Sequence, residues 1–230
     1  MSLFLNCSAT AGILLTSTLA NAGVIQFSLS PPPTGGAITC IAGAAGPDTG
    51  LLVFDQTTAL SFSINATSEG LGVINFPNAR LVMSMAVPPA VDQGGGFFRA
   101  NVTGTFSIYD FTGNTRRDIL TGTLTGGQFL KFGSSHVILL NSNSGLTYSA
   151  GPALTSVLGP GRTLAPSHDG TFALSNVRTP SGATEILGPG NVFQTFFANT
   201  AFTGSTNVIP SPGAIALLGA GGVLMARRRR

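Results

Sequence analysis

The chain has 230 residues, of which 43% are hydrophobic and only 8% are charged, so it can form a packed core and is unlike a charged disordered tail. Its formal net charge of +3 comes from the last four residues: 11 basic residues less these 4 leave 7, against 8 acidic ones. Nucleic-acid binding needs Lys and Arg spread over a face of the domain, so we expect no nucleic-acid partner.

The amino-terminal segment, residues 1–22, has the features of a signal peptide. Its short apolar stretch is followed by Ala20, Asn21 and Ala22. Small residues at Ala20 and Ala22 match the A-x-A pattern of a signal-peptidase site, which predicts cleavage before Gly23. No Lys or Arg precedes the apolar stretch, and the alternative is that it forms a first buried strand or helix of the domain.

Residues 23–207 are predicted to form one all-β domain. Apolar residues alternate with polar ones in five segments, at Ile25, Phe27 and Leu29; Leu60, Phe62 and Ile64; Leu81, Met83, Met85 and Val87; Ala100, Val102, Phe106 and Ile108; and Phe172 and Leu174. This alternation is typical of half-buried strands. Turn clusters separate them at 43–50, 88–89, 94–96, 126–127, 141–145, 159–161 and 188–190. We therefore expect a single β-sandwich, of jelly-roll or similar type, without an internal helix.

Few residues of this domain suggest chemistry. Cys40 is its only cysteine, and we interpret it as a small buried residue. His136 lacks a nucleophile motif, and His168 with Asp169 are interpreted as exposed turn residues before Gly170. Most of the eight acidic residues adjoin Gly or end a strand, as turn-capping Asp does. We expect no catalytic residue, no cofactor and no metal, and hence a protein that is not an enzyme.

The carboxyl-terminal segment, residues 208–230, combines a Pro-containing motif, an apolar stretch and a basic end. Residues 208–226 carry no charge, close to the 20 residues or so that a membrane-spanning helix needs. The basic end is typical of a stop-transfer signal that is kept on the cytoplasmic side. The expected motif is Pro210, Ser211 and Pro212; the expected helix includes Gly213, Ala214, Leu217, Leu218, Gly222 and Leu224; and the stop-transfer residues are Arg227, Arg228, Arg229 and Arg230.

These three parts in this order closely resemble the PEP-CTERM sorting signal, with Ser211 in place of the central Glu of that family. The resemblance covers residues 208–230 and does not extend to the β domain. It implies that an exosortase, a membrane-embedded cysteine transpeptidase, reads and processes the segment. It also implies a bacterium that makes extracellular polysaccharide. The alternative is an ordinary single-pass membrane anchor.

These features together predict an exported protein of the cell envelope, cell surface or extracellular matrix. The leading hypothesis is a non-enzymatic structural protein whose Ser- and Thr-rich surface suits a polysaccharide matrix and offers hydroxyls for O-glycans. A carbohydrate-binding module is the alternative, and it requires an exposed aromatic or polar platform. Phe97-Phe98 and Phe196-Phe197 each place one ring on either side of a strand, so one ring of each pair is a candidate for exposure. A hydrolase would need two carboxylates or a Ser, His and Asp that converge.

Overall fold

The computed structural model describes residues 23–30, 38–54 and 57–210. Twelve strands form one antiparallel sheet in this part of the chain. The strands are β1 Gly23–Ser30, β2 Ile38–Gly46, β3 Thr49–Phe54, β4 Leu60–Ala66, β5 Gly72–Val87, β6 Val91–Asp92, β7 Phe97–Asp110, β8 Arg117–Phe132, β9 Ser135–Asn141, β10 Thr147–Ala150, β11 Arg162–Arg178 and β12 Phe196–Pro210. The helix α1 is Pro152–Leu158, and the 3-10 turns are η1 Thr67–Glu69, η2 Thr112–Asn114, η3 Ser142–Ser144 and η4 Pro189–Asn191.

The sheet closes on itself. Strands β1, β4, β5, β7, β8, β9, β11 and β12 pair in that order, and β12 pairs with β1 again. The hairpin of β2 and β3 bridges β12 and β5. Closure gives most of the backbone groups at the edges of these strands a partner, which removes edges that would otherwise pair with other chains.

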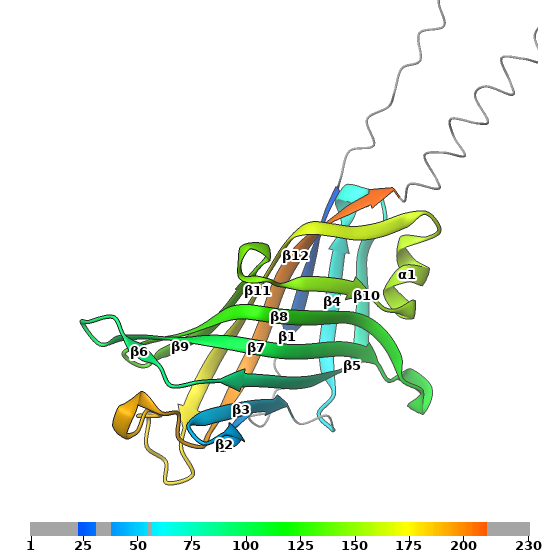
Figure 1. The fold of residues 1–230 in the computed structure, drawn as a ribbon. Helices are drawn as coiled ribbons and strands as arrows, with labels where there is room; N and C mark the ends of the chain where they lie inside the picture. Colours follow the sequence, from blue (N-terminus) through cyan, green and yellow to red (C-terminus); the bar gives the residue numbers. More distant parts are fainter. Residues whose placement is uncertain (1–22, 31–37, 55–56, 211–230) are drawn as a thin grey trace, which may run out of the picture.

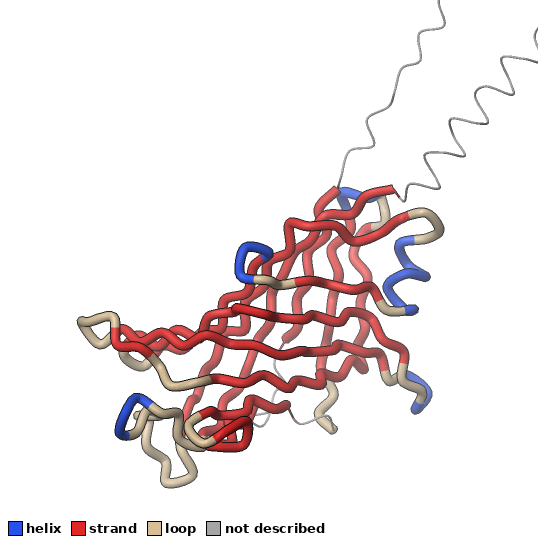
Figure 2. The backbone as a smooth tube through the Cα atoms, in the orientation of Figure 1, coloured by secondary structure: helices blue, strands red, loops and turns tan. Residues whose placement is uncertain are grey.

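The closed sheet is flattened into two crossing layers. In Figure 1, β7 and β8 run across the view in front of β1, β4 and β12, which run steeply behind them. The long strand β5 belongs to both layers, since its first half pairs with β4 and its second half with β7. Figure 2 shows that strands make up nearly all of the body and that loops and helices lie at its periphery. The prediction of an all-β domain is confirmed.

Large aromatic rings fill the space between the layers. Phe106 of β7 lies edge-on to Phe172 of β11 and to Phe202 of β12, with ring centroids 5.2 and 5.4 Å apart. A second group joins Phe129 of β8 to Phe193, at 4.9 Å. Every apolar position predicted from the alternation of residues is buried. Because burying one such side chain contributes about 1.5–3 kcal/mol, this core is the main stabilising term of the fold.

Two predictions about local structure are wrong. The helix α1 was not expected, and it forms because Pro152 starts it favourably while Ala153, Leu154 and Leu158 are buried on one side. Gly126 and Gly127 were expected in a turn but lie inside β8. A side chain at Gly127 would collide with Leu124 and Leu140, so this glycine serves close packing rather than a turn.

The predicted burial of Cys40 is confirmed. Its side chain is fully buried between the layers and makes no disulfide. Burial raises the pKa of the thiol to about 12, because the charged thiolate is poorly solvated there. The thiol is therefore an inert packing group at neutral pH.

Within the described residues, we find no helix that has the length and apolar character needed to cross a membrane.

Candidate functional site

A row of polar side chains crosses five neighbouring strands on the outside of the sheet. Strand pairing aligns one residue from each of β4, β1, β12, β11 and β9, and in that order they are Asn65, Gln26, Ser205, Asp169 and Asn141. Adjacent strands lie about 4.8 Å apart, so the row is about 19 Å long. From β4 to β9, it presents two amides, one hydroxyl, one carboxylate and a third amide to the solvent.

A second row runs parallel to the first, two residues along each strand. It consists of Ser63, Ser28, Thr203, Thr171 and Leu139, aligned by the same pairings. Both rows line one hollow of about 550 Å³ in the twisted sheet. We call this hollow with its two rows the groove. Of the ten side chains in the rows, nine are polar, and Asp169 is the charged one among these nine; the tenth, Leu139, is apolar.

The floor of the groove depends on two glycines that lie opposite each other. Gly170 of β11 pairs with Gly204 of β12. The Tyr148 hydroxyl lies directly beneath, where a Cβ atom at Gly170 or Gly204 would be 2.6 or 2.8 Å from its oxygen. Any side chain at either position would displace this tyrosine, so the floor is restricted to backbone.

Tyr148 holds that floor in place from inside the core. Its hydroxyl donates a hydrogen bond of 2.8 Å to the carbonyl oxygen of Asp169. Its ring lies edge-on to Phe27 of β1, with centroids 5.6 Å apart. Burial raises the pKa of the Tyr148 hydroxyl, and the Asp169 charge adds to the effect, so the hydroxyl remains a donor at neutral pH.

An irregularity in β11 lies directly before Asp169. The pairing of β11 with β12 shifts between Ala165 and Asp169, and it resumes at Asp169 on both sides of the strand. Within the bulge, His168 points inward and is 5% exposed, and directly after it Asp169 lies on the outside of the sheet and lines the groove. The interpretation of His168 as an exposed turn residue is therefore wrong, because the bulge is part of a strand and buries it.

His168 is fixed by polar contacts beneath the groove. Its Nδ1 lies 2.6 Å from the Thr206 hydroxyl oxygen, and that hydroxyl donates to the Ala165 carbonyl at 3.1 Å. Because the single hydroxyl proton is used there, His168 donates from Nδ1. The Ser142 side chain also bonds both backbone groups of His168. Burial lowers the pKa of His168, although the nearby Asp169 charge opposes this.

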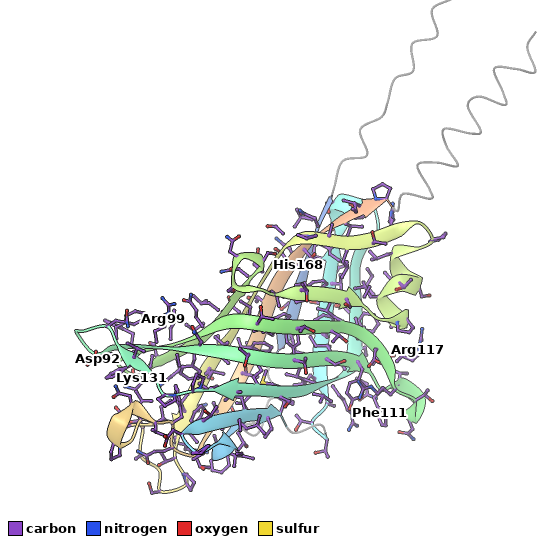
Figure 3. All side chains as sticks on the ribbon, viewed as in Figure 1. Asp92, Arg99, Phe111, Arg117, Lys131 and His168 are labelled. Atoms are coloured by element: carbon purple, nitrogen blue, oxygen red, sulfur yellow. The ribbon has the colours of Figure 1, made fainter. Side chains whose placement is uncertain are left out.

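Another buried polar cluster lies at the other end of the domain. Lys131, which Figure 3 shows near the hairpin of β6 and β7, is 5% exposed and lies 3.1 Å from Glu185. His136 on the adjacent strand is equally buried, and neither of its ring nitrogens makes a hydrogen bond of ordinary geometry within the described residues. Burial lowers the pKa of His136, and the Lys131 charge lowers it further. The ion pair between Lys131 and Glu185 links the loop before β12 to the sheet.

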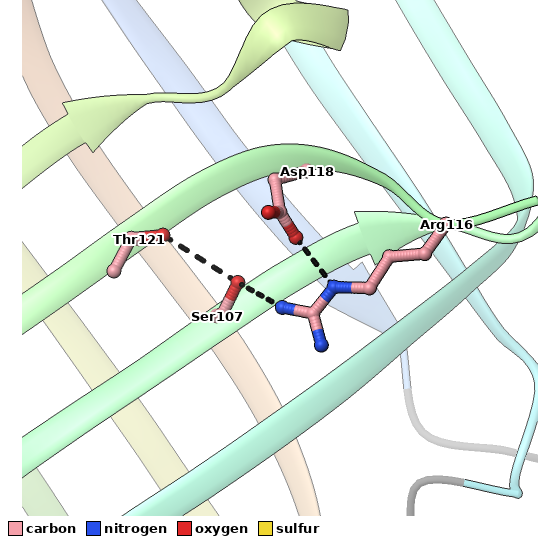
Figure 4. Close-up of polar contacts among 4 residues, drawn as sticks. All are labelled: Ser107, Arg116, Asp118 and Thr121. Atoms are coloured by element: carbon pink, nitrogen blue, oxygen red, sulfur yellow. Dashed lines mark hydrogen bonds and ion pairs between the residues drawn. The ribbon is translucent and has the colours of Figure 1, made fainter.

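The other layer of the sheet, on β5, β7, β8 and β10, also carries hydroxyls on its outer side. Two aligned sets are Ser84, Thr105, Thr123 and Thr147, and Ser107, Thr121 and Ser149; we call them the hydroxyl face. At its end Arg116 donates from Nε to Asp118 at 2.8 Å and bonds Ser107, as Figure 4 shows. The same guanidinium lies over the Tyr109 ring, 4.4 Å from its centroid.

The two pairs of phenylalanines that the sequence offered as an aromatic platform differ in their exposure to solvent. Phe196 is fully buried and Phe197 is 40% exposed, so one ring of that pair reaches solvent. Phe97 and Phe98 are both half-buried, and Phe98 lies against Lys131. None of these rings lines the groove, whose apolar lining comes from Phe27, Leu139 and Leu140 instead.

The structure includes few of the predicted processing residues. Gly23 is the first residue of β1 and pairs with Val208, so both ends of the domain leave from the same side. Pro210 is the last residue of β12, three residues beyond the expected domain end at Asn207. Ala20, Ala22, Ser211, Pro212, the apolar segment and the four terminal arginines lie outside the described residues, and their roles stay predictions. In the described ranges no group of three or more His, Cys, Asp or Glu side chains is placed to hold a metal ion.

The residues of the groove were not identified as a site from the sequence. The alternation around Ile25, Phe27 and Leu29 places Gln26 and Ser28 on the exposed side of their strand, as the structure has them, but nothing local connects them to Thr203 or Asp169. Only the pairing of β1 with β12, and of β12 with β11, brings these positions together. Comparison with protein-family models, with curated proteins and with solved structures finds no match.

Proposed function

We propose that this protein is a non-enzymatic component of the bacterial cell surface or extracellular matrix, and that its β domain binds polysaccharide in the groove. The single observation that carries the binding proposal is the alignment of nine polar side chains in two rows over five strands. Sugars present hydroxyls that both donate and accept, and amides and hydroxyls are the side chains that match them in both roles.

The shape of the groove supports a chain-like ligand. The rows lie on a closed sheet rather than on loops, so their side chains are held by rigid strands. The hollow is open and extends across the strands, which suits several sugar rings in succession better than a small molecule enclosed in a cavity. We also propose that the domain is a single β-sandwich, in which the two crossing layers of the closed sheet pack face to face.

The delivery part of the proposal rests on the two ends of the sequence. A signal peptide cleaved before Gly23 and a PEP-CTERM-like segment read by an exosortase would bring the domain to the envelope. An intact-mass measurement on each cell fraction tests this. Loss of residues 1–22 and of the chain after about Pro210 from a surface fraction supports it, whereas a full-length chain in the cytoplasm overturns it.

The binding part is tested with a panel of polysaccharides and two matched variants of the full chain. Gln26→Ala with Thr203→Val removes two polar groups from the groove, and Thr105→Val with Thr123→Val removes two from the hydroxyl face. We expect the wild type to bind at least one polysaccharide and the groove variant to bind it at least tenfold more weakly. We expect the hydroxyl-face variant to bind like the wild type. No binding to any polysaccharide, or equal loss in both variants, contradicts the proposal.

A further inference from the structure

The groove contains one charge. Of the fourteen residues that line it, Asp169 alone is ionisable as an acid or a base, and no Lys, Arg or His is among them. Arg162, at the end of the same strand, is paired with Glu69 at 3.5 Å and bonds the Leu158 carbonyl. The Asp169 carboxylate therefore faces the groove without a cation to neutralise it there.

The carboxylate is held in a defined position. Its Oδ2 accepts a hydrogen bond of 3.0 Å from the Ser205 hydroxyl on the neighbouring strand. Its backbone is fixed from below by Tyr148 and by the resumption of pairing on both sides of the bulge. Its Oδ1 has no hydrogen-bond partner in the described part of the chain, and this oxygen is available to a ligand.

A metal ion is a poor match for this single carboxylate. Calcium takes six to eight oxygen ligands, commonly several carboxylates, whereas the groove offers one. The adjacent Asn141 side chain already accepts a hydrogen bond from the Ser144 backbone. An ammonium group, by contrast, needs a single carboxylate and two further acceptors. The Ser205 hydroxyl lies opposite Asp169 on β12, and the Thr171 hydroxyl lies two residues further along β11.

We infer that the groove selects a polysaccharide that carries free amino groups, and that Asp169 is the residue that determines this specificity. This inference rests on the proposed function. The amino group of one sugar ring donates to Oδ1 of Asp169, while the rows of amides and hydroxyls bind the ring hydroxyls on either side. A polysaccharide of uronic acids is disfavoured, since its carboxylates would face Asp169 without a cation between them.

The experiment compares three soluble oligosaccharides with the same full chain by calorimetry: a glucosamine oligomer, its fully N-acetylated form and a uronic-acid oligomer. We expect the glucosamine oligomer to bind at least tenfold more tightly than the other two at low ionic strength. This preference should shrink when salt is raised to 0.15 M, where the screening length is about 8 Å. Poly-lysine is the fourth probe, and we expect it to bind more weakly than the glucosamine oligomer.

Two variants separate the possible outcomes. Asp169→Asn keeps an acceptor for Ser205, and we expect it to lose the preference while it still binds the N-acetylated oligomer. Asp118→Asn, on the hydroxyl face, should retain the preference. A wild type that binds both oligomers equally, or that binds neither but binds another polysaccharide of the panel, overturns this inference and leaves polysaccharide binding intact. One that binds no polysaccharide overturns the proposed function as well. Poly-lysine binding as tight as that of the glucosamine oligomer, and lost in Asp169→Asn, overturns the choice of a sugar ligand.

Discussion

The groove and the hydroxyl face are built from the same kind of residue, yet they differ in what lies beneath and beside them. Both present Ser and Thr in rows across antiparallel strands. Under the groove lie two glycines, a tyrosine hydroxyl and a buried histidine, whereas the hydroxyl face ends in an exposed ion pair over a tyrosine ring. Two surfaces of similar composition therefore differ in charge. Among the described residues, the groove has a fixed carboxylate with no cation beside it, whereas the hydroxyl face has a carboxylate that is paired with an arginine.

The largest expected effect comes from a residue that both faces share. Phe106 is anchored in β7 of the hydroxyl face and contacts Phe172 and Phe202 under the groove. Phe106→Ala should cost about 3–5 kcal/mol of unfolding free energy, because it leaves a cavity between the layers. Denaturant unfolding measures this loss. A cost below about 1 kcal/mol would mean that the two layers do not depend on a common core.

A smaller effect should be confined to the groove. Tyr148→Phe removes the hydroxyl that supports the Asp169 carbonyl and should cost about 1–3 kcal/mol, since a buried acceptor loses its donor. Polysaccharide binding should weaken with it. Tyr109→Phe is the matched change on the other face, and it should leave both stability and binding close to those of the wild type. If the two variants behave alike, the tyrosine under the groove has no special role.

The acid stability of the protein should also depend on the groove side. The pKa of His168 is lowered by burial, so the unfolded chain takes up a proton at this residue before the folded chain does. Stability should fall as the pH drops below about 6.5, the ordinary pKa of histidine, by at most about 2 kcal/mol for this residue at pH 5. His136, whose pKa is lowered in the same direction, adds a loss of the same sign.

The variant His168→Asn isolates the first contribution, because Asn also donates a hydrogen bond toward Thr206 but does not titrate. Unfolding free energies at pH 7 and pH 5 should differ less in this variant than in the wild type, the remainder being due to His136. An unchanged pH dependence would show that the environment of His168 does not disfavour the protonated ring.

The smallest effect is expected at the end of the hydroxyl face. Arg116 and Asp118 are 48% and 40% exposed, and such pairs contribute between zero and about 1 kcal/mol. Arg116→Ala should therefore lower the unfolding free energy by less than about 1 kcal/mol and leave polysaccharide binding unchanged. A marked loss of binding would move the binding surface to this face and contradict the assignment to the groove.

The all-β class, the strands at Ile25, Leu60, Leu81 and Phe172, and the burial of Cys40 could all be predicted from the amino-acid sequence. The fold class and the strands follow from period-two alternation, which is a local property that survives in any sheet the strand joins. The burial of Cys40 follows from the tendency of a free cysteine to pack as a small apolar residue. The helix at Pro152–Leu158 was missed because seven residues are too few for a helical period to be recognised.

Three features could not be predicted without the fold: the closure of the sheet, the bulge of β11 before Asp169, and the joining of two rows of polar side chains into one groove. Closure and register depend on pairings between residues far apart in the chain, such as Gln26 with Ser205, for which no local pattern exists. The burial of His168 likewise depends on β11 continuing through the bulge as a strand, because a turn at this point would leave the ring exposed. The candidate site therefore came from strand pairing, whereas the class of the fold came from composition and periodicity.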